Sequence, residues 1–182
     1  MIPRLRADHD IIRARAHWRY RGRSRPEFAD QVKEGQISVW DFSRPPIQVS
    51  VDNPLTVKLG GELIAYTERG VAVKETAGAP TYYFPPEDVK VTLSATSARS
   101  LCEWKGMARS LSVHGVEHAA WRYEEMFEEF ESLYLWVAFY PALLECYVGG
   151  ERATPQPGGY YGGWVTSDLC GPIKGEPGSS GW

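Results

Sequence analysis

The sequence has no apolar stretch long enough to cross a bilayer. No window approaches the roughly 18 consecutive apolar residues that a membrane-spanning helix needs, and the Arg-rich first thirty residues lack the apolar segment of a secretory signal. Cysteine is scarce: Cys102, Cys146 and Cys170 are an odd set without C-x-x-C spacing. This pattern argues against a disulfide framework and a structural zinc site. We therefore expect a cytoplasmic protein with reduced thiols and no membrane partner.

The common catalytic signatures are also missing. The chain contains no G-x-x-x-x-G-K-[ST], no strand-borne G-x-G-x-x-G, no G-x-S-x-G and no H-E-x-x-H. His114 and His118 lie four residues apart, but Gly115 between them favours a turn, and two imidazoles alone make a poor metal site. We predict no metal site and no cofactor.

Aromatic residues, in contrast, are abundant. Seven Trp, ten Tyr and six Phe make up 13% of the 182 residues, and 43% of the chain is hydrophobic. This composition predicts one soluble domain with an aromatic core. So many large rings also predict that several lie partly at the surface, where they offer stacking surfaces to a ligand.

Positive charge is concentrated at the start of the chain. Residues 1–25 hold eight arginines against Asp8 and Asp10, although the whole chain has a net charge of −3. Trp18 and Tyr20 among these arginines would suit a nucleic acid. We favour the alternative that the guanidiniums pair with the protein's own acidic surface or with a second copy in a homodimer, because the rest of the chain is acidic.

Short alternating segments predict a mainly β fold. Residues 55–59 and 63–66 flank Gly60-Gly61 and read as a hairpin, and further strands are expected at 71–75, 81–84, 89–93, 108–113, 135–140 and 144–148. Such closely spaced strands indicate a small antiparallel β-barrel or a β-sandwich, and not a βαβ fold. One short helix is expected within 123–133, where Met126, Phe127, Phe130 and Leu133 have helical spacing.

We divide this single domain, residues 1–182, into three parts. Residues 1–52 are an Arg-rich N-terminal arm with one expected edge strand near Ile37–Trp40, and residues 53–152 are the β core. Residues 153–182 form a C-terminal arm rich in Gly and Pro. Tyr160, Tyr161, Trp164 and Trp182 predict that this arm is ordered and wraps on the core.

The densest group of reactive side chains is the run Cys102-Glu103-Trp104-Lys105-Gly106. If the run is extended, Glu103 and Lys105 point to one side, and Cys102 and Trp104 point to the other. With the charged pair inward, Glu103 is a candidate general base and Lys105 a positive group for an oxyanion. With Trp104 inward, the pair is a surface salt bridge and the tryptophan belongs to the core.

Five motifs in order resemble the family catalogued as domain of unknown function 427. They are Pro80-Thr81-Tyr82-Tyr83-Phe84-Pro85, Cys102 to Gly106, Ala120-Trp121, Val137-Ala138-Phe139-Tyr140-Pro141 and Gly149-Gly150-Glu151. The similarity covers about residues 55–152, and the flanks, with Ser38-Val39-Trp40-Asp41, Tyr161-Gly162-Gly163-Trp164 and Gly171-Pro172-Ile173-Lys174-Gly175, look like the longer form of the family. The resemblance implies a small, mostly antiparallel β-tent fold, without the paired zinc-binding C-x-x-C motifs of related tent folds.

That family also carries a nominal nucleotidyltransferase label, which this sequence does not support. Such enzymes need a Gly-Ser turn followed by spaced aspartates that hold two Mg²⁺ ions. Asp8-His9-Asp10 is the only D-x-D and has no Gly-Ser before it, whereas Gly178-Ser179 lies near the C-terminus.

We therefore predict a small-molecule site in an aromatic-lined pocket of the β fold. Its ligand is expected to carry a carbonyl group. The candidate activity is that of a cofactor-independent hydrolase, lyase or cyclase, and the alternative is a non-catalytic module that binds a peptide or protein. The predicted catalytic residues are Glu103 and Lys105. The predicted ligand-binding residues are Glu75, Tyr82, Tyr83, Trp104, Trp121, Arg122, Phe139 and Tyr160.

Overall fold

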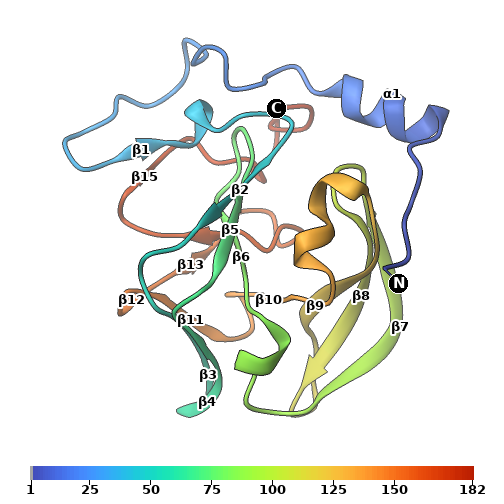
Figure 1. Cartoon of the computed structure of the whole chain (residues 1–182). Coiled ribbons are helices and arrows are strands. Elements are labelled where there is room, and N and C mark those ends of the chain that lie inside the picture. The colour runs from blue at the N-terminus through green and yellow to red at the C-terminus, as the bar shows by residue number, and fades with distance from the viewer. Residues whose placement is uncertain (1) are drawn as a thin grey trace.

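β-Strands dominate the chain, and the computed structural model describes residues 2–182 (Figure 1). The strands are β1 (Ile37–Ser38), β2 (Ile47–Ser50), β3 (Leu55–Leu59), β4 (Glu62–Thr67), β5 (Val71–Lys74), β6 (Thr81–Tyr83), β7 (Leu93–Cys102), β8 (Gly106–Val113), β9 (Val116–Met126), β10 (Val137–Phe139), β11 (Glu145–Val148), β12 (Glu151–Arg152), β13 (Thr154–Pro155), β14 (Trp164–Val165) and β15 (Leu169–Cys170). The helices are the α-helix α1 (His9–His17) and the 3-10 helices η1 (Val39–Asp41), η2 (Pro86–Asp88) and η3 (Glu128–Leu133).

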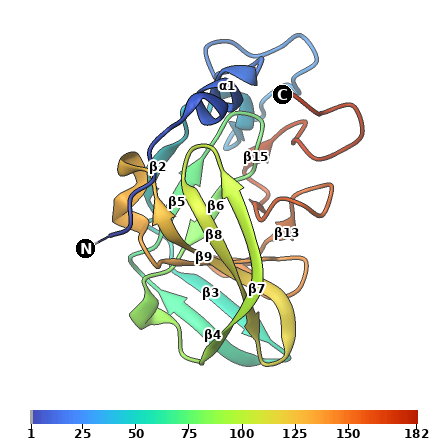
Figure 2. The ribbon, with the colours of Figure 1, turned by 90° about the vertical axis from the view of Figure 1, so that its right-hand side faces the viewer.

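Three antiparallel sheets form the body of the molecule. The first has the strand order β10-β9-β8-β7, the second β12-β11-β3-β4 and the third β2-β5-β6. In Figure 2 the long strands β7, β8 and β9 lie toward the viewer, β3 and β4 lie below them, and the C-terminal segment runs along one side. The fold is mainly β, as expected. Among residues 2–182 no sheet closes on itself, so the barrel that we expected is not found.

The hairpin expected around Gly60-Gly61 is present and shows how the sequence sets the register. Leu55 and Val57 of β3 are fully buried, while Thr56 between them is partly exposed. Gly60 and Gly61 have φ values of 57° and 86°, which a tight turn between twisted strands requires. β3 therefore pairs with β4, whose Ile64 and Ala65 are also fully buried, whereas Leu63 and Tyr66 are exposed.

The prediction of a helix within 123–133 is wrong for residues 123–126. Residues 123–126 complete β9, where Tyr123 pairs with Ala108 and Met126 with Gly106 of β8, and only 128–133 turn, as the 3-10 helix η3. The ladder of hydrogen bonds to β8 fixes these residues as strand despite their helical apolar spacing, and the remaining segment is too short for a stable α-helix. Glu128 and Glu129 are exposed, as expected of the polar face.

The strand expected at 89–93 is also largely absent. Val89 makes one isolated bridge to Ala65, and the continuous strand begins only at Leu93. η2 precedes this segment, and Lys90 donates its main-chain N–H to Ile64. The segment is therefore a connection between two sheets.

The two arms, of which the structure describes residues 2–52 and 153–182, dock on the core and on one another. The N-terminal arm crosses the top of the molecule in Figure 1, close to the C-terminus. β1 pairs in parallel with β15, and Trp182 stacks on Phe28 with ring centroids 5.1 Å apart. β2, although within residues 1–52, pairs with β5 of the core. The C-terminal arm is ordered, but Tyr160 is 71% exposed.

Several arginines of the N-terminal arm pair with the protein's own carboxylates. Arg4 pairs with Glu131, and Arg15 Nη1 lies 3.1 Å from Glu129 Oε1, so both arginines fasten the arm to η3. Arg25 Nη2 lies 2.6 Å from Asp41 Oδ2 within the arm. The structure thus provides intramolecular partners for these guanidiniums.

Arg44 connects both arms to the core. Its side chain is fully buried, and its Nε donates to Glu75 Oε1 at 2.8 Å. The other guanidinium nitrogens donate to the main-chain oxygens of Tyr20, Trp182 and Thr76 at 2.8, 2.9 and 3.0 Å. One cation therefore serves acceptors from the N-terminal arm, the C-terminal arm and the core.

Replacing Arg44 should loosen both arms. We expect Arg44→Ala to lower the free energy of unfolding by about 3–5 kcal/mol, because it leaves the Glu75 carboxylate and three carbonyls without their donor. Urea denaturation measures the change. The matched control is Arg25→Ala, which removes an exposed ion pair in the same arm and should have a much smaller effect. Equal effects of the two substitutions would contradict the role assigned to Arg44.

Candidate functional site

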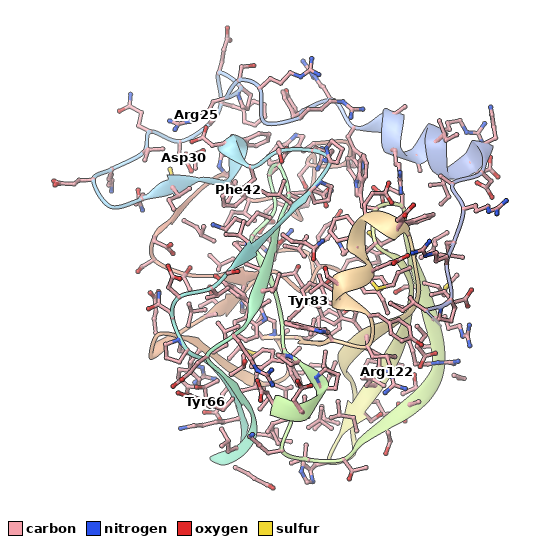
Figure 3. All side chains as sticks on the ribbon, in the orientation of Figure 1. Arg25, Asp30, Phe42, Tyr66, Tyr83 and Arg122 are labelled. Atoms are coloured by element: carbon pink, nitrogen blue, oxygen red, sulfur yellow. The ribbon has the colours of Figure 1, made fainter. Side chains whose placement is uncertain are left out.

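A cavity of about 700 Å³ lies between the sheet of β7, β8 and β9 and the two arms. The core contributes Tyr83, Trp121 and the end of the β7–β8 hairpin to its wall. The arms contribute Trp18, residues 159–162 and Lys174. Tyr83 lies well inside the ribbon in Figure 3, where side chains from several elements converge. The cavity is therefore formed jointly by the core and both arms.

The predicted catalytic pair lies on this wall, but in a turn. Cys102 pairs with Gly106, so residues 103–105 are the turn of the β7–β8 hairpin and not the extended strand that we expected. Strand alternation does not apply there. Glu103 and Lys105 both line the cavity, and Trp104 is nevertheless buried, with 5% of its surface exposed. The two orientations that we weighed as alternatives therefore coexist.

Glu103 is held by the N-terminal arm. Trp18 Nε1 donates to Glu103 Oε1 at 2.6 Å, and Arg15 Nε donates to the main-chain oxygen of Glu103 at 2.7 Å. Arg15 also lies over the rings of Trp104 and Phe127, 5.1 and 4.7 Å from their centroids. These contacts fix the carboxylate in one position on the cavity wall.

Lys105 keeps its positive charge in this setting. Burial lowers the pKa of an ammonium, but attraction to the negative charges that Cys102, Tyr83 and Glu75 carry when ionised outweighs burial and raises the pKa of Lys105 above its usual value. The cavity therefore contains a permanent cation near neutral pH.

Two tyrosines remain protonated beside it. Burial raises the pKa of Tyr83 to about 12 and also raises the pKa of Tyr123 well above its usual value. The Tyr83 hydroxyl is buried and has no hydrogen-bond partner among residues 2–182, although it belongs to a residue on the cavity wall. Since an unpaired buried hydroxyl is costly, Tyr83 is a ready hydrogen-bonding group for a ligand.

Lys174 is a charged residue of the cavity that sequence reasoning missed. It is 6% exposed, and its Nζ lies 3.6 Å from the ring centroid of Trp18 and 4.8 Å from that of Tyr161. Burial and the nearby Arg44 lower its pKa to about 8, although Glu75 and Glu103 oppose the shift. A lysine in a Gly/Pro-rich arm has no sequence signature of burial, and only the unassigned Gly171–Gly175 motif marks it.

Four of the predicted ligand-binding residues line the cavity, and four do not. Glu75, Tyr83, Trp121 and Tyr160 lie on its wall or rim. Tyr82 and Phe139 are buried in the core, where Tyr82 packs on Trp164 with centroids 5.0 Å apart and Phe139 meets Phe84 edge-on at 5.2 Å.

The other two predicted residues lie elsewhere for definite reasons. Trp104 is packed under Arg15, and within β9 Arg122 Nη2 donates to Glu124 Oε1 at 3.0 Å. Arg122 is labelled in Figure 3. Neighbouring residues on a strand face opposite sides, so Tyr82 is directed away from the cavity that Tyr83 lines, and Arg122 away from the cavity that Trp121 lines. This alternation was available in the sequence once the strands were assigned.

A second polar pair lies elsewhere on the wall. Ser110 Oγ and His118 Nδ1 are 2.7 Å apart, and both residues line the cavity. His118 has a φ of 57° and lies where the register between β8 and β9 shifts. Its backbone conformation is therefore accounted for by a bulge in the sheet.

The remaining predicted features are distributed as follows. Cys146 is buried in the core, and burial raises the pKa of its thiol. In the part of the chain that the structure describes, no three His, Cys, Asp or Glu side chains gather as a metal site.

Asp8 caps α1 by accepting from Ile11 N at 2.9 Å, and Asp10 pairs with Arg13, so this D-x-D stabilises a helix start. Of the helices formed by residues 2–182, none has the length and apolar character to cross a bilayer.

The loop 159–162 packs closely on one wall of the cavity. A Cβ atom at Gly162 would overlap the six-membered ring of Trp121, which itself packs on Tyr140 with centroids 4.4 Å apart. We expect Gly162→Ala to displace the loop or the indole and to lower the free energy of unfolding by about 1–3 kcal/mol. Near-UV circular dichroism and urea denaturation measure the two effects.

Gly78→Ala is the matched control for this substitution. At Gly78 the added methyl group meets the main-chain oxygen of Glu75 at 3.5 Å, an ordinary contact. A signal from the aromatic rings that is the same in both variants would contradict the close packing of Gly162 on Trp121.

Comparison with known proteins identifies the family and assigns no reaction. A comparison with curated proteins found no match. Residues 48–150 match the family NTP_transf_9, described as a domain of unknown function (DUF427). Because this match spans more than half of the 182 residues, the protein belongs to the DUF427 family.

Proposed function

We propose that this protein binds a small carbonyl-containing molecule in its aromatic-walled cavity and transforms it by acid–base chemistry without a cofactor. The observation that carries the proposal is the presence of Glu103 and Lys105 on the wall of one cavity of about 700 Å³. Ligand sites for small molecules typically have volumes of about 300–1,000 Å³, apolar walls and a few converging polar groups.

In this proposal Glu103 is the general base. Its carboxylate is oriented by the Trp18 N–H, and it accepts the proton from the carbon next to the ligand's carbonyl group, or from a water molecule that attacks this group. A fixed base avoids the loss of conformational freedom that a mobile glutamate would suffer on binding.

Lys105 supplies the opposite charge. When the proton moves to Glu103, negative charge develops on the carbonyl oxygen, and an ammonium that stays protonated stabilises it. The raised pKa of Lys105 supports this role, because a group that lost its proton near pH 7 could not serve it. The Tyr83 hydroxyl is a second donor for the same oxygen.

The walls define the ligand class. Trp18, Trp121 and Tyr161 offer ring faces to a flat, conjugated molecule, while Glu75 supplies an acceptor whose position Arg44 fixes. Hydrolysis, elimination and ring closure all begin with the proton transfer described above. The proposal therefore covers a hydrolase, a lyase or a cyclase.

The rim of the cavity favours a second candidate function, the binding of a peptide without catalysis. Leu101, Leu143 and Tyr160 line the opening and are 49%, 45% and 71% exposed. Exposed apolar side chains around a groove are typical of interaction sites. The two functions differ in whether the charged pair affects turnover.

Substitution of the charged pair tests the catalytic proposal. With acetophenone as probe, whose α-protons exchange only slowly in neutral water, we expect the wild type to accelerate their exchange in D₂O, followed by NMR. Glu103→Gln should slow this exchange by about 10²–10⁴-fold because the general base is lost. Lys105→Met should slow it by about 10²–10³-fold because the charge opposite the oxyanion is lost.

The control variants carry the same changes at exposed positions. Glu117→Gln and Lys90→Met should exchange the probe at the wild-type rate, since both side chains lie on the surface outside the cavity. Unchanged exchange in Glu103→Gln and Lys105→Met would remove both residues from the mechanism. Absence of exchange in the wild type, together with saturable binding of an apolar peptide, would favour the non-catalytic function.

A further inference from the structure

We propose that Lys174 is a nucleophilic amine that forms an imine with the carbonyl group of the bound ligand. This inference rests on the proposed function, because it needs a carbonyl compound in the cavity. It adds a covalent step and places the reactive group in the C-terminal arm, outside the residues that match the family.

The surroundings of Lys174 suit an amine more than a structural ion pair. The residue is 6% exposed yet lines the cavity, and its Nζ lies over the ring of Trp18. Among residues 2–182, no carboxylate forms a salt bridge or hydrogen bond with this nitrogen. Glu75 is instead bonded to Arg44, and Glu103 to Trp18.

A second cation lies close to the amine. Arg44 lies over the same Trp18 ring, with its Cζ 4.4 Å from the centroid. Burial and repulsion from Arg44 disfavour the ammonium form, whereas Glu75 and Glu103 favour it. The balance is a pKa of about 8, at which roughly one-tenth of the amine is neutral at pH 7. Desolvation and a neighbouring cation are the usual means of activating a lysine nucleophile.

The two lysines of the cavity are shifted in opposite directions. The pKa of Lys105 is raised by Cys102, Tyr83 and Glu75, and that of Lys174 is lowered by burial and Arg44. Groups whose environments separate their pKa values in this way commonly divide the roles in a reaction. Lys105 is therefore the fixed cation, and Lys174 is the amine that attacks.

The covalent step balances without any oxidant or cofactor. The neutral Nζ of Lys174 attacks the carbonyl carbon and the π electrons of the C=O bond move to the oxygen. The nitrogen then loses one proton and the oxygen takes up a proton, which gives a carbinolamine. Loss of this hydroxyl group as water leaves a C=N bond to Nζ. Glu103, whose charge acts on Lys174, is available to accept the ammonium proton and to return it to the departing oxygen.

Reductive trapping tests the imine. The intact protein is incubated with benzaldehyde and sodium cyanoborohydride, which adds hydride to the iminium carbon and leaves a benzylated lysine. Peptide mass spectrometry then measures the rate at each lysine. At pH 7 we expect Lys174 to be modified at least about tenfold faster than exposed Lys90, because a pKa of about 8 gives Lys174 a far larger neutral fraction than an ordinary lysine side chain has. Below pH 8 its rate should rise about tenfold per pH unit and then level off.

Lys105 and two variants serve as controls. Lys105 should stay unmodified although it shares the cavity, because its ammonium does not release a proton. Lys174→Arg keeps a buried cation but has no imine-forming amine, so it should bind benzaldehyde and lose the fast modification. Lys90→Met should leave the labelling of Lys174 unchanged.

Binding without reductant separates failure of this inference from failure of the proposed function. Quenching of tryptophan fluorescence by benzaldehyde, compared between wild type and Gly162→Ala, reports whether the probe enters the cavity. A bound probe with no excess labelling of Lys174 over Lys90 overturns the imine and leaves the binding proposal standing. Absence of both binding and labelling overturns both proposals for aromatic carbonyl compounds.

Discussion

A buried guanidinium holds this molecule together. Arg44 is enclosed completely, so the free energy of removing its charge from water must be offset by its acceptors. Those acceptors are Glu75, the carbonyl of Thr76 and the carbonyls of Tyr20 and Trp182. Because two of these belong to the arms, the arms can leave the core only by exposing Arg44 or leaving it unpaired. The order of both arms is thus coupled to one residue.

This coupling makes the cavity a composite structure. The residues that match the family supply the hairpin turn with Glu103 and Lys105 and the ring of Trp121. The arms supply Trp18, which orients Glu103, and Lys174, which brings a second nitrogen to the same wall. The arms therefore determine which molecules fit and which groups meet them, while the central sheets provide a scaffold.

The sequence predicts local structure here better than spatial relations. The hairpin at 55–66 followed from alternation and paired glycines, and the ordered C-terminal arm followed from its aromatic residues. The segment 123–126 was assigned wrongly, because pairing with β8 overrides helical spacing. Glu103 and Lys105 were selected by chemical type. The turn in which they lie was not predicted, because the run from Cys102 to Gly106 contains no recognised turn sequence. Lys174 could not be found, because its burial depends on contacts with a segment more than 150 residues earlier. A cytoplasmic location and a homodimer stay predictions from the sequence alone.

The indole of Trp18 lies at the meeting point of these charges. Its N–H is bonded to Glu103, and both Arg44 and Lys174 lie over its ring. Since a cation interacts with the negative face of an aromatic quadrupole, the electrostatic field on this ring changes whenever Lys174 gains or loses its proton. Among the tryptophans of the chain, Trp18 is thus the one whose ring is linked by contact to the protonation of Lys174 and, through its N–H, to the carboxylate of Glu103.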